Sequence, residues 1–93
     1  MDQIITRVAR QFSVSPVSIV QAARGPGSKN IPRWVAMYLC QEVGAVTLQV
    51  IASRFGLKRY GTVSTTIGKL KAELPGNLQL QRELARLVQQ LGK

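Results

Sequence analysis

The chain has 93 residues, the usual length of one domain, and 45% of them are hydrophobic, which is enough for one compact core. Its formal net charge of +9 indicates a polyanionic partner: DNA first, then RNA, then an acidic membrane surface. No apolar run approaches the ~20 residues of a membrane span, and the first residues lack the apolar stretch of a signal peptide. A single cysteine excludes an internal disulfide and fits a reducing compartment, so we expect a cytoplasmic protein associated with the nucleoid.

Catalytic and metal-binding chemistry is not expected from this sequence. Histidine, the commonest general base and metal ligand, is missing. The four acids, Asp2, Glu42, Glu73 and Glu83, are too scattered to predict a carboxylate pair or a metal-binding cluster. Cys40 lies in an apolar series with helical spacing, so we expect a buried small hydrophobe rather than a nucleophile. We therefore predict no enzymatic activity, no cofactor, no metal site and no small-molecule substrate.

Two short helices are expected at the N-terminus. The first spans residues 2–12 and directs Arg7 and Arg10 outward. The second spans residues 16–23, where a capping serine is followed by proline at the first helical position. The residues available for the core are Ile4, Ile5, Val8, Phe12, Val17, Ile19 and Val20.

A loop rich in glycine and proline is expected over residues 24–31. It carries Arg24 and Lys29, and Arg33 follows just inside the next helix, residues 32–43. This charge fits two interpretations equally: an ordinary surface loop, or a basic loop that lies over phosphates or reaches into a minor groove. The helix after the loop is expected to direct Ala36, Leu39, Cys40 and Val43 inward and to fill spaces between helices with Trp34, Met37 and Tyr38.

Residues 47–71 have the pattern of a helix-turn-helix. The first helix is capped by Thr47, ends at Gly56, and has an inward stripe of Leu48, Ile51, Ala52 and Phe55. The second helix has an inward series of Val63, Ile67, Leu70 and Leu74. In a helix-turn-helix, the second of two helices joined by a tight turn can enter a DNA major groove.

The outward residues of this segment favour DNA binding over a plain helical hairpin. Between Thr47 and Ala72 there are five basic residues and no acidic ones, whereas an ordinary solvated helix mixes both signs. Cations beside short hydroxyl side chains suit phosphate contacts and hydrogen bonds to base edges. The residues expected in or beside the major groove are Lys58, Arg59, Tyr60, Thr62, Thr65 and Lys69, with Arg24, Lys29 and Arg33 on the backbone or in the adjacent minor groove.

A last helix is expected over residues 77–91, with Asn77 as its cap. One of its faces carries Leu80, Leu84, Leu87, Val88 and Leu91. So large an apolar stripe must be buried. It either completes the core of the domain, which we favour, or forms a two-fold contact, so that residues 78–91 could carry a homodimer.

Together these elements predict an all-α fold of about six short helices around a helix-turn-helix. We expect residues 1–93 to form a single DNA-binding domain. Its helical core would span residues 2–74, its helix-turn-helix residues 47–71, and an extra C-terminal helix residues 77–91.

Four motifs occur in a fixed order along the chain: V-A-x-x-F at 8–12, P-R-x-x-A-M-Y-L at 32–39, T-L-x-x-I-x-x-x-F-G at 47–56 and T-V at 62–63. In combination they resemble the C-terminal DNA-binding domain of the bacterial replication initiator DnaA, a helical domain related to the Trp repressor fold. The resemblance covers roughly residues 4–74. It implies binding of double-stranded DNA through the helix-turn-helix.

The turn departs from the G-R-D-H-T-T-V pattern of that family, since residues 57–63 read LKRYGTV. Lys58 keeps the positive charge, and Thr62 and Val63 match the second threonine and the buried valine. The acid, the histidine and the first threonine are replaced by Arg59, Tyr60 and Gly61. The DNA specificity of the initiator is therefore not implied, and without an ATPase domain neither is replication initiation.

The residues F-G-L-x-x-Y-G-x-V-S at 55–64 are more similar to the initiator-like domain attached to REP-associated tyrosine transposases. Those enzymes need a histidine pair and a tyrosine nucleophile in a separate domain, which is missing here. We therefore predict a sequence-selective recognition module for double-stranded DNA, with no membrane partner. The alternatives are a protein-interaction or dimerisation module that uses the last helix and the surface of Trp34 and Tyr38, with incidental charge, and an RNA-binding module.

Overall fold

The computed structural model describes residues 1–21 and 30–91, and every regular element in these ranges is helical. The elements are α1 (Asp2–Gln11), α2 (Pro16–Val20), α3 (Ile31–Glu42), α4 (Leu48–Arg54), α5 (Tyr60–Glu73), a 3₁₀ turn η1 (Leu74–Gly76) and α6 (Leu78–Leu91). The predicted all-α class with six α-helices is confirmed for this part of the chain.

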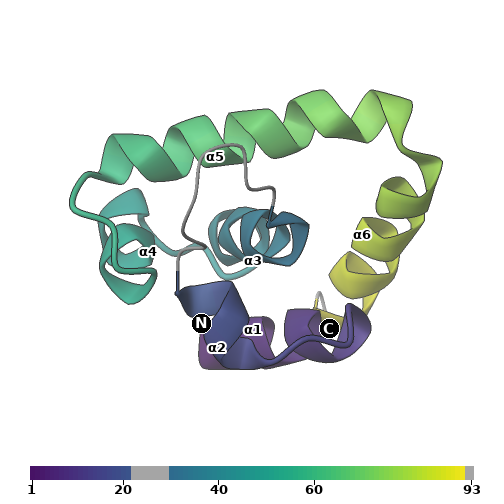
Figure 1. Ribbon diagram of the computed structural model, residues 1–93, viewed down its shortest axis with the longest axis horizontal. Helices are drawn as coiled ribbons and strands as arrows, with labels where there is room; N and C mark the ends of the chain where they lie inside the picture. Colours follow the sequence, from purple (N-terminus) through teal and green to yellow (C-terminus); the bar gives the residue numbers. More distant parts are fainter. Residues whose placement is uncertain (22–29, 92–93) are drawn as a thin grey trace.

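Helix α3 lies at the centre of the molecule (Figure 1). It contacts α1 and α2 on one side and α4 and α5 on the other. Helix α5 runs along the top of the view, and α6 leads from its end back to α1 at the bottom. The outward faces of α5 and α1 therefore look away from each other across α3.

Side-chain caps fix where most of these helices begin. The oxygens of Ser15, Asn30, Thr47 and Asn77 accept backbone N–H bonds of 3.0 to 3.4 Å at the starts of α2, α3, α4 and α6. The caps at Ser15, Thr47 and Asn77 confirm the prediction. Asn30 lies in the expected loop, but it caps α3, so that the helix begins at Ile31, one residue earlier than expected.

The core agrees with the predicted apolar stripes at most positions. The leucines at 80, 84 and 87 are buried within the chain itself, which confirms the intramolecular alternative for the last helix. The expectation that Val17 and Val88 lie in the core is wrong. Val17 is 60% exposed because it lies on the opposite side of α2 from Ile19, the buried residue of this helix. Val88 is 40% exposed because it lies beside the stripe of leucines rather than in it.

The helices of the described ranges do not qualify as membrane spans, and the longest have 14 residues.

Candidate nucleic-acid interface

The turn between α4 and α5 is closed by a Schellman motif. Gly56 adopts a left-handed backbone with φ of 69°, and its N–H donates to the carbonyl of Ser53 at 3.3 Å. The N–H of Leu57 donates to the carbonyl of Ala52 at 2.8 Å. These two bonds satisfy the last carbonyls of α4 and redirect the chain into α5. The predicted role of Gly56 is confirmed.

Helix α5 packs one face on α3 and α4 and leaves the other in solvent. Val63, Ile67 and Leu70 are buried on its inner face. The six residues of this segment expected to contact DNA are all exposed: Lys58, Arg59, Tyr60, Thr62, Thr65 and Lys69. The structure therefore brings them together on the outer side of the turn and of α5.

The outermost line of α5 carries only small residues. Gly61, Thr65, Gly68 and Ala72 recur at helical spacing, all are exposed, and we call them the small-residue strip. A Cβ atom added to Gly61 or Gly68 would meet nothing within 4 Å. A glycine inside a helix costs about 1 kcal/mol relative to alanine, so packing within the domain gives no reason to keep it. Glycine at such a position lets another molecule approach the helix backbone closely. The helical spacing of these four residues is visible in the sequence, but their exposure is not.

The threonines of α5 differ in what they can offer to a base edge. The Thr65 hydroxyl donates to the Gly61 carbonyl at 3.0 Å, so its oxygen remains an acceptor. The half-buried Thr66 hydroxyl donates to the Thr62 carbonyl at 2.8 Å. Within the described residues the Thr62 hydroxyl donates to no acceptor, so it can both donate and accept.

The N-terminus of α5 has no side-chain cap, in contrast to α2, α3, α4 and α6. Arg59 occupies the N-cap position with an extended backbone, and its side chain makes no capping bond. The positive end of the helix dipole is therefore available to an anion. The exposed cations of Lys58 and Arg59 lie at the same end of the helix.

A surface hollow of about 310 Å³ lies between α4 and the start of α5. Ala52 and Leu57 contribute apolar lining, and Lys58 and Tyr60 come from the predicted site. Gln49 and Ser53 of α4 complete the lining and can donate hydrogen bonds. Neither residue was expected at the site from the sequence.

Two of the basic residues counted toward this segment have partners in the fold. Arg54 forms an ion pair with Asp2 of α1, with its Nε and one terminal nitrogen 3.1 and 3.0 Å from the same carboxylate oxygen. The Lys71 ammonium lies 6.0 Å from the centre of the Tyr38 ring. The cations that remain for an external partner are concentrated near the start of α5 and at Lys69.

Arg33 is not on the interface, and this corrects the expectation that it contacts the DNA backbone. It is only 6% exposed. Its guanidinium donates to the carbonyls of Ile19 and Val20 at the end of α2 and, at 2.9 Å, to the carbonyl of Phe55 at the end of α4. It also lies 5.3 Å from the centre of the Phe55 ring. Burial lowers its pKa, and its donors are used inside the fold, where they join α2 to the turn.

Arg24 and Lys29 lie outside the described residues. Among those that are described, no cluster of His, Cys, Asp or Glu could hold a metal ion. Cys40 is fully buried, as predicted, and burial raises the pKa of its thiol to about 11.

With this geometry in place, comparison with known proteins identifies the family. A family model described as the bacterial dnaA protein helix-turn-helix matches residues 1–70, which hold α1 to α4 and most of α5. The chain belongs to this family. It is a DNA-binding helix-turn-helix domain of the DnaA C-terminal type, as the motifs indicated.

Bacterial initiators are among its relatives. The chain is 34% identical over 89 residues to the chromosomal replication initiator protein DnaA of Limosilactobacillus fermentum, covering 94% of this chain and 20% of that protein. It is 29% identical over 89 residues to the DnaA of Nautilia profundicola, with the same coverage. It is 34% identical over 86 residues to the DnaA of a Bradyrhizobium species, covering 90% of this chain and 17% of that protein. The chain thus spans about a fifth of these relatives. No solved structure matches it.

Proposed function

We propose that this domain binds double-stranded DNA sequence-selectively, with the N-terminal half of α5 in the major groove. The observation that carries the proposal is the outer side of α5: it is exposed, it has basic residues at both ends, and no acid occurs between Thr47 and Ala72. In this proposal residues 1–93 act as one domain in the cytoplasm, at the nucleoid. Residues 2–74 form its helical core, and residues 77–91 an additional helix.

Base-edge recognition is assigned to three side chains near the start of α5. Arg59 can pair bidentately with guanine, the commonest specific contact in a major groove. Thr62 can donate or accept, because its hydroxyl is not used as a donor in the described fold. Thr65 offers an acceptor oxygen and a methyl group that suits thymine. The small-residue strip supports this assignment, because it lets the backbone of α5 approach the groove floor.

Phosphate contacts are assigned to the periphery of α5. Lys58, Lys69, Gln49, Ser53 and the uncapped start of α5 supply donors on both sides of the recognition residues. Arg24 and Lys29 remain proposed contacts to the backbone or the minor groove. With Lys58, Arg59 and Lys69 they give five cations. The logarithm of affinity should then fall with the logarithm of salt concentration at a slope of about −4 to −5.

Selection of bound sites from a random duplex library tests this proposal. Enrichment of one motif, with salt-sensitive retention, is expected. Absence of both would leave the protein-interaction alternative, and preferential competition by structured RNA would favour the RNA-binding one.

Replacing Arg59 by alanine tests its assigned role. The variant should lose about 1–3 kcal/mol of discrimination between the selected site and its variants at one base pair. Equal weakening on all sequences would instead make Arg59 a phosphate contact.

A homodimer through residues 78–91 would have to use Leu78 and Val88, the large apolar side chains that α6 leaves exposed. Sedimentation equilibrium with and without the selected duplex, on wild type and Val88→Gln, separates a monomer from such a dimer.

A further inference from the structure

A second basic surface lies on α1 and α6, away from the recognition helix. It consists of four exposed arginines, Arg7, Arg10, Arg82 and Arg86, which we call the arginine face. None of them forms a hydrogen bond or an ion pair through its side chain with another described residue, so their charges are not compensated within that part of the fold. The proposed DNA contacts on α5 use none of these residues.

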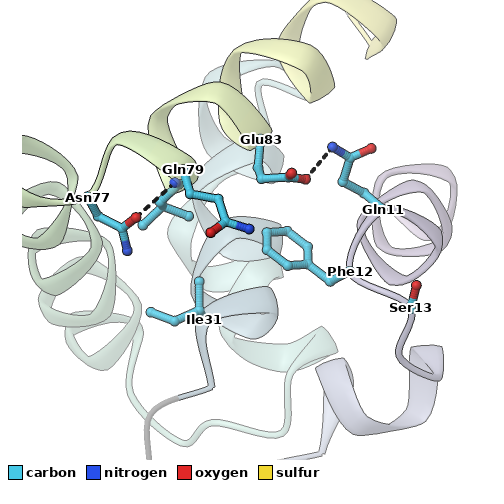
Figure 2. Close-up of a pocket in the computed structure, with 8 residues that line it drawn as sticks. Gln11, Phe12, Ser13, Ile31, Asn77, Gln79 and Glu83 are labelled. Carbon is cyan, nitrogen blue, oxygen red and sulfur yellow. Dashed lines mark hydrogen bonds between the residues drawn. The ribbon is translucent and has the colours of Figure 1, made fainter.

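The junction of α1 and α6 makes the arginine face continuous. The two helices are in contact, and the Gln11 side-chain amide donates to the Glu83 carboxylate across the junction (Figure 2). Arg7 lies one helical turn before Gln11, and Arg86 lies one turn after Glu83, so both flank this bond on the solvent side. Glu83 is the one acid among the described residues of the junction, and its carboxylate already accepts from Gln11.

The residues around the arginines are mainly polar and uncharged, and the exposed Leu78 lies one turn before Arg82. The exposed neighbours on the two helices include Gln3, Thr6, Gln79 and Gln90. Arginines spaced along two adjoining helices can contact successive phosphates, because their positive charges attract phosphate oxygens and the amides and hydroxyls between them can donate hydrogen bonds. A lipid surface fits less well. Helices that lie on membranes insert their apolar face, and the apolar faces of α1 and α6 are buried in the core.

The arginine face and the recognition helix can be occupied together. Helix α3 separates α1 from α5, and the Cα atoms span 30 × 28 × 23 Å (Figure 1). Even the shortest of these dimensions exceeds the Debye length of about 8 Å at physiological ionic strength, so repulsion between two duplexes on opposite sides is largely screened.

We propose that the arginine face binds the phosphate backbone of a second DNA duplex without sequence selectivity, so that one copy of the domain bridges two DNA segments. This inference rests on the proposed function for the first duplex. Neutralising about four phosphates gives a salt slope of about −3.6, so the affinity of this face should fall about 150-fold between about 50 and 200 mM salt.

The test uses a selected duplex on beads, a fluorescent duplex of unrelated sequence in solution, and the full 93-residue chain. Wild type should retain the fluorescent duplex at low salt. The variant R7Q/R10Q/R82Q/R86Q should bind the selected duplex within about twofold of wild type and retain at least tenfold less of the second one. The matched variant R7K/R10K/R82K/R86K keeps the charge and should keep bridging. Circular dichroism confirms that both variants are folded.

Four results would overturn the inference. Bridging by the glutamine variant at the wild-type level would assign it to dimers that use two recognition helices. Loss of bridging in both variants would show that the positive charge of the arginine face does not hold the second duplex. Absence of bridging by wild type, with the selected duplex still bound, would remove the second site and leave the proposed function intact. If the selected duplex itself is not bound, the proposed function fails instead. Binding of anionic phospholipid vesicles by wild type, without bridging, would reassign the face to membranes.

Discussion

Substitutions at Gly68 separate most sharply the effect on the stability of the domain from the effect on its proposed binding of DNA. Gly68 lies in the middle of α5, on the small-residue strip, and an added Cβ would meet nothing within 4 Å. Gly68→Ala should therefore raise the free energy of unfolding by about 1 kcal/mol, because alanine loses less conformational freedom in a helix. For a domain of this size that corresponds to a rise of about 4–8 °C in Tm.

Gly68→Leu should keep most of this stabilisation, because the helix propensity of leucine is close to that of alanine. Its side chain, however, would occupy the space in which the groove floor is proposed to lie. We expect affinity for the selected duplex to fall at least tenfold, or about 1.4 kcal/mol. Thermal unfolding by circular dichroism measures the first effect, and fluorescence anisotropy with labelled duplex measures the second.

A control on another helix isolates the position of the new side chain. Ala85→Leu places the same leucine on an exposed position of α6 and should leave affinity unchanged. If Gly68→Leu binds the selected duplex as tightly as wild type, the outer strip of α5 does not face the groove. If Gly68→Ala lowers Tm, the space beside Gly68 is not open as the geometry requires.

The two other predictions concern the core. Arg33→Ala should lower the free energy of unfolding, measured by urea titration, by at least about 3 kcal/mol. Three backbone carbonyls lose their donor, at about 1–3 kcal/mol each. A loss below about 1 kcal/mol would mean that water or another donor replaces the guanidinium. Burial raises the pKa of the Cys40 thiol from 9.0 to about 11, so the stability that the neutral thiol contributes is complete below pH 9 and is lost as the pH rises toward 11. Over that range wild type should lose more stability than Cys40→Ala, and parallel curves for the two proteins would contradict the assignment.

The helix-turn-helix could be predicted from sequence because its signals are local. The Thr47 cap, the left-handed Gly56 and the inward series from Val63 lie within one continuous segment, and each specifies a neighbouring bond or face. The exposure of Lys58 and Arg59 followed from the same periodicity. Local propensity and tertiary packing agree in this part of the chain.

The basic residues were assigned wrongly where their partners are distant in the sequence. The sequence displays the charge of Arg33, but its partners are backbone carbonyls 13, 14 and 22 residues away, which no side-chain pattern reveals. The ion pair of Arg54 with Asp2 spans 52 positions and likewise required the fold. Gly68 is a different case. Its spacing was visible, but its significance depends on open space that only the packed helix defines.

The most direct test of the central claim, that the outer side of α5 meets the duplex, is a nuclear magnetic resonance titration of the backbone amides with the selected duplex. At one equivalent of duplex and physiological salt, the largest chemical-shift changes should fall between Lys58 and Lys69, with smaller ones at Gln49 and Ser53. Changes confined to α1, α2 or α6, with the amides of α5 unmoved, would contradict it.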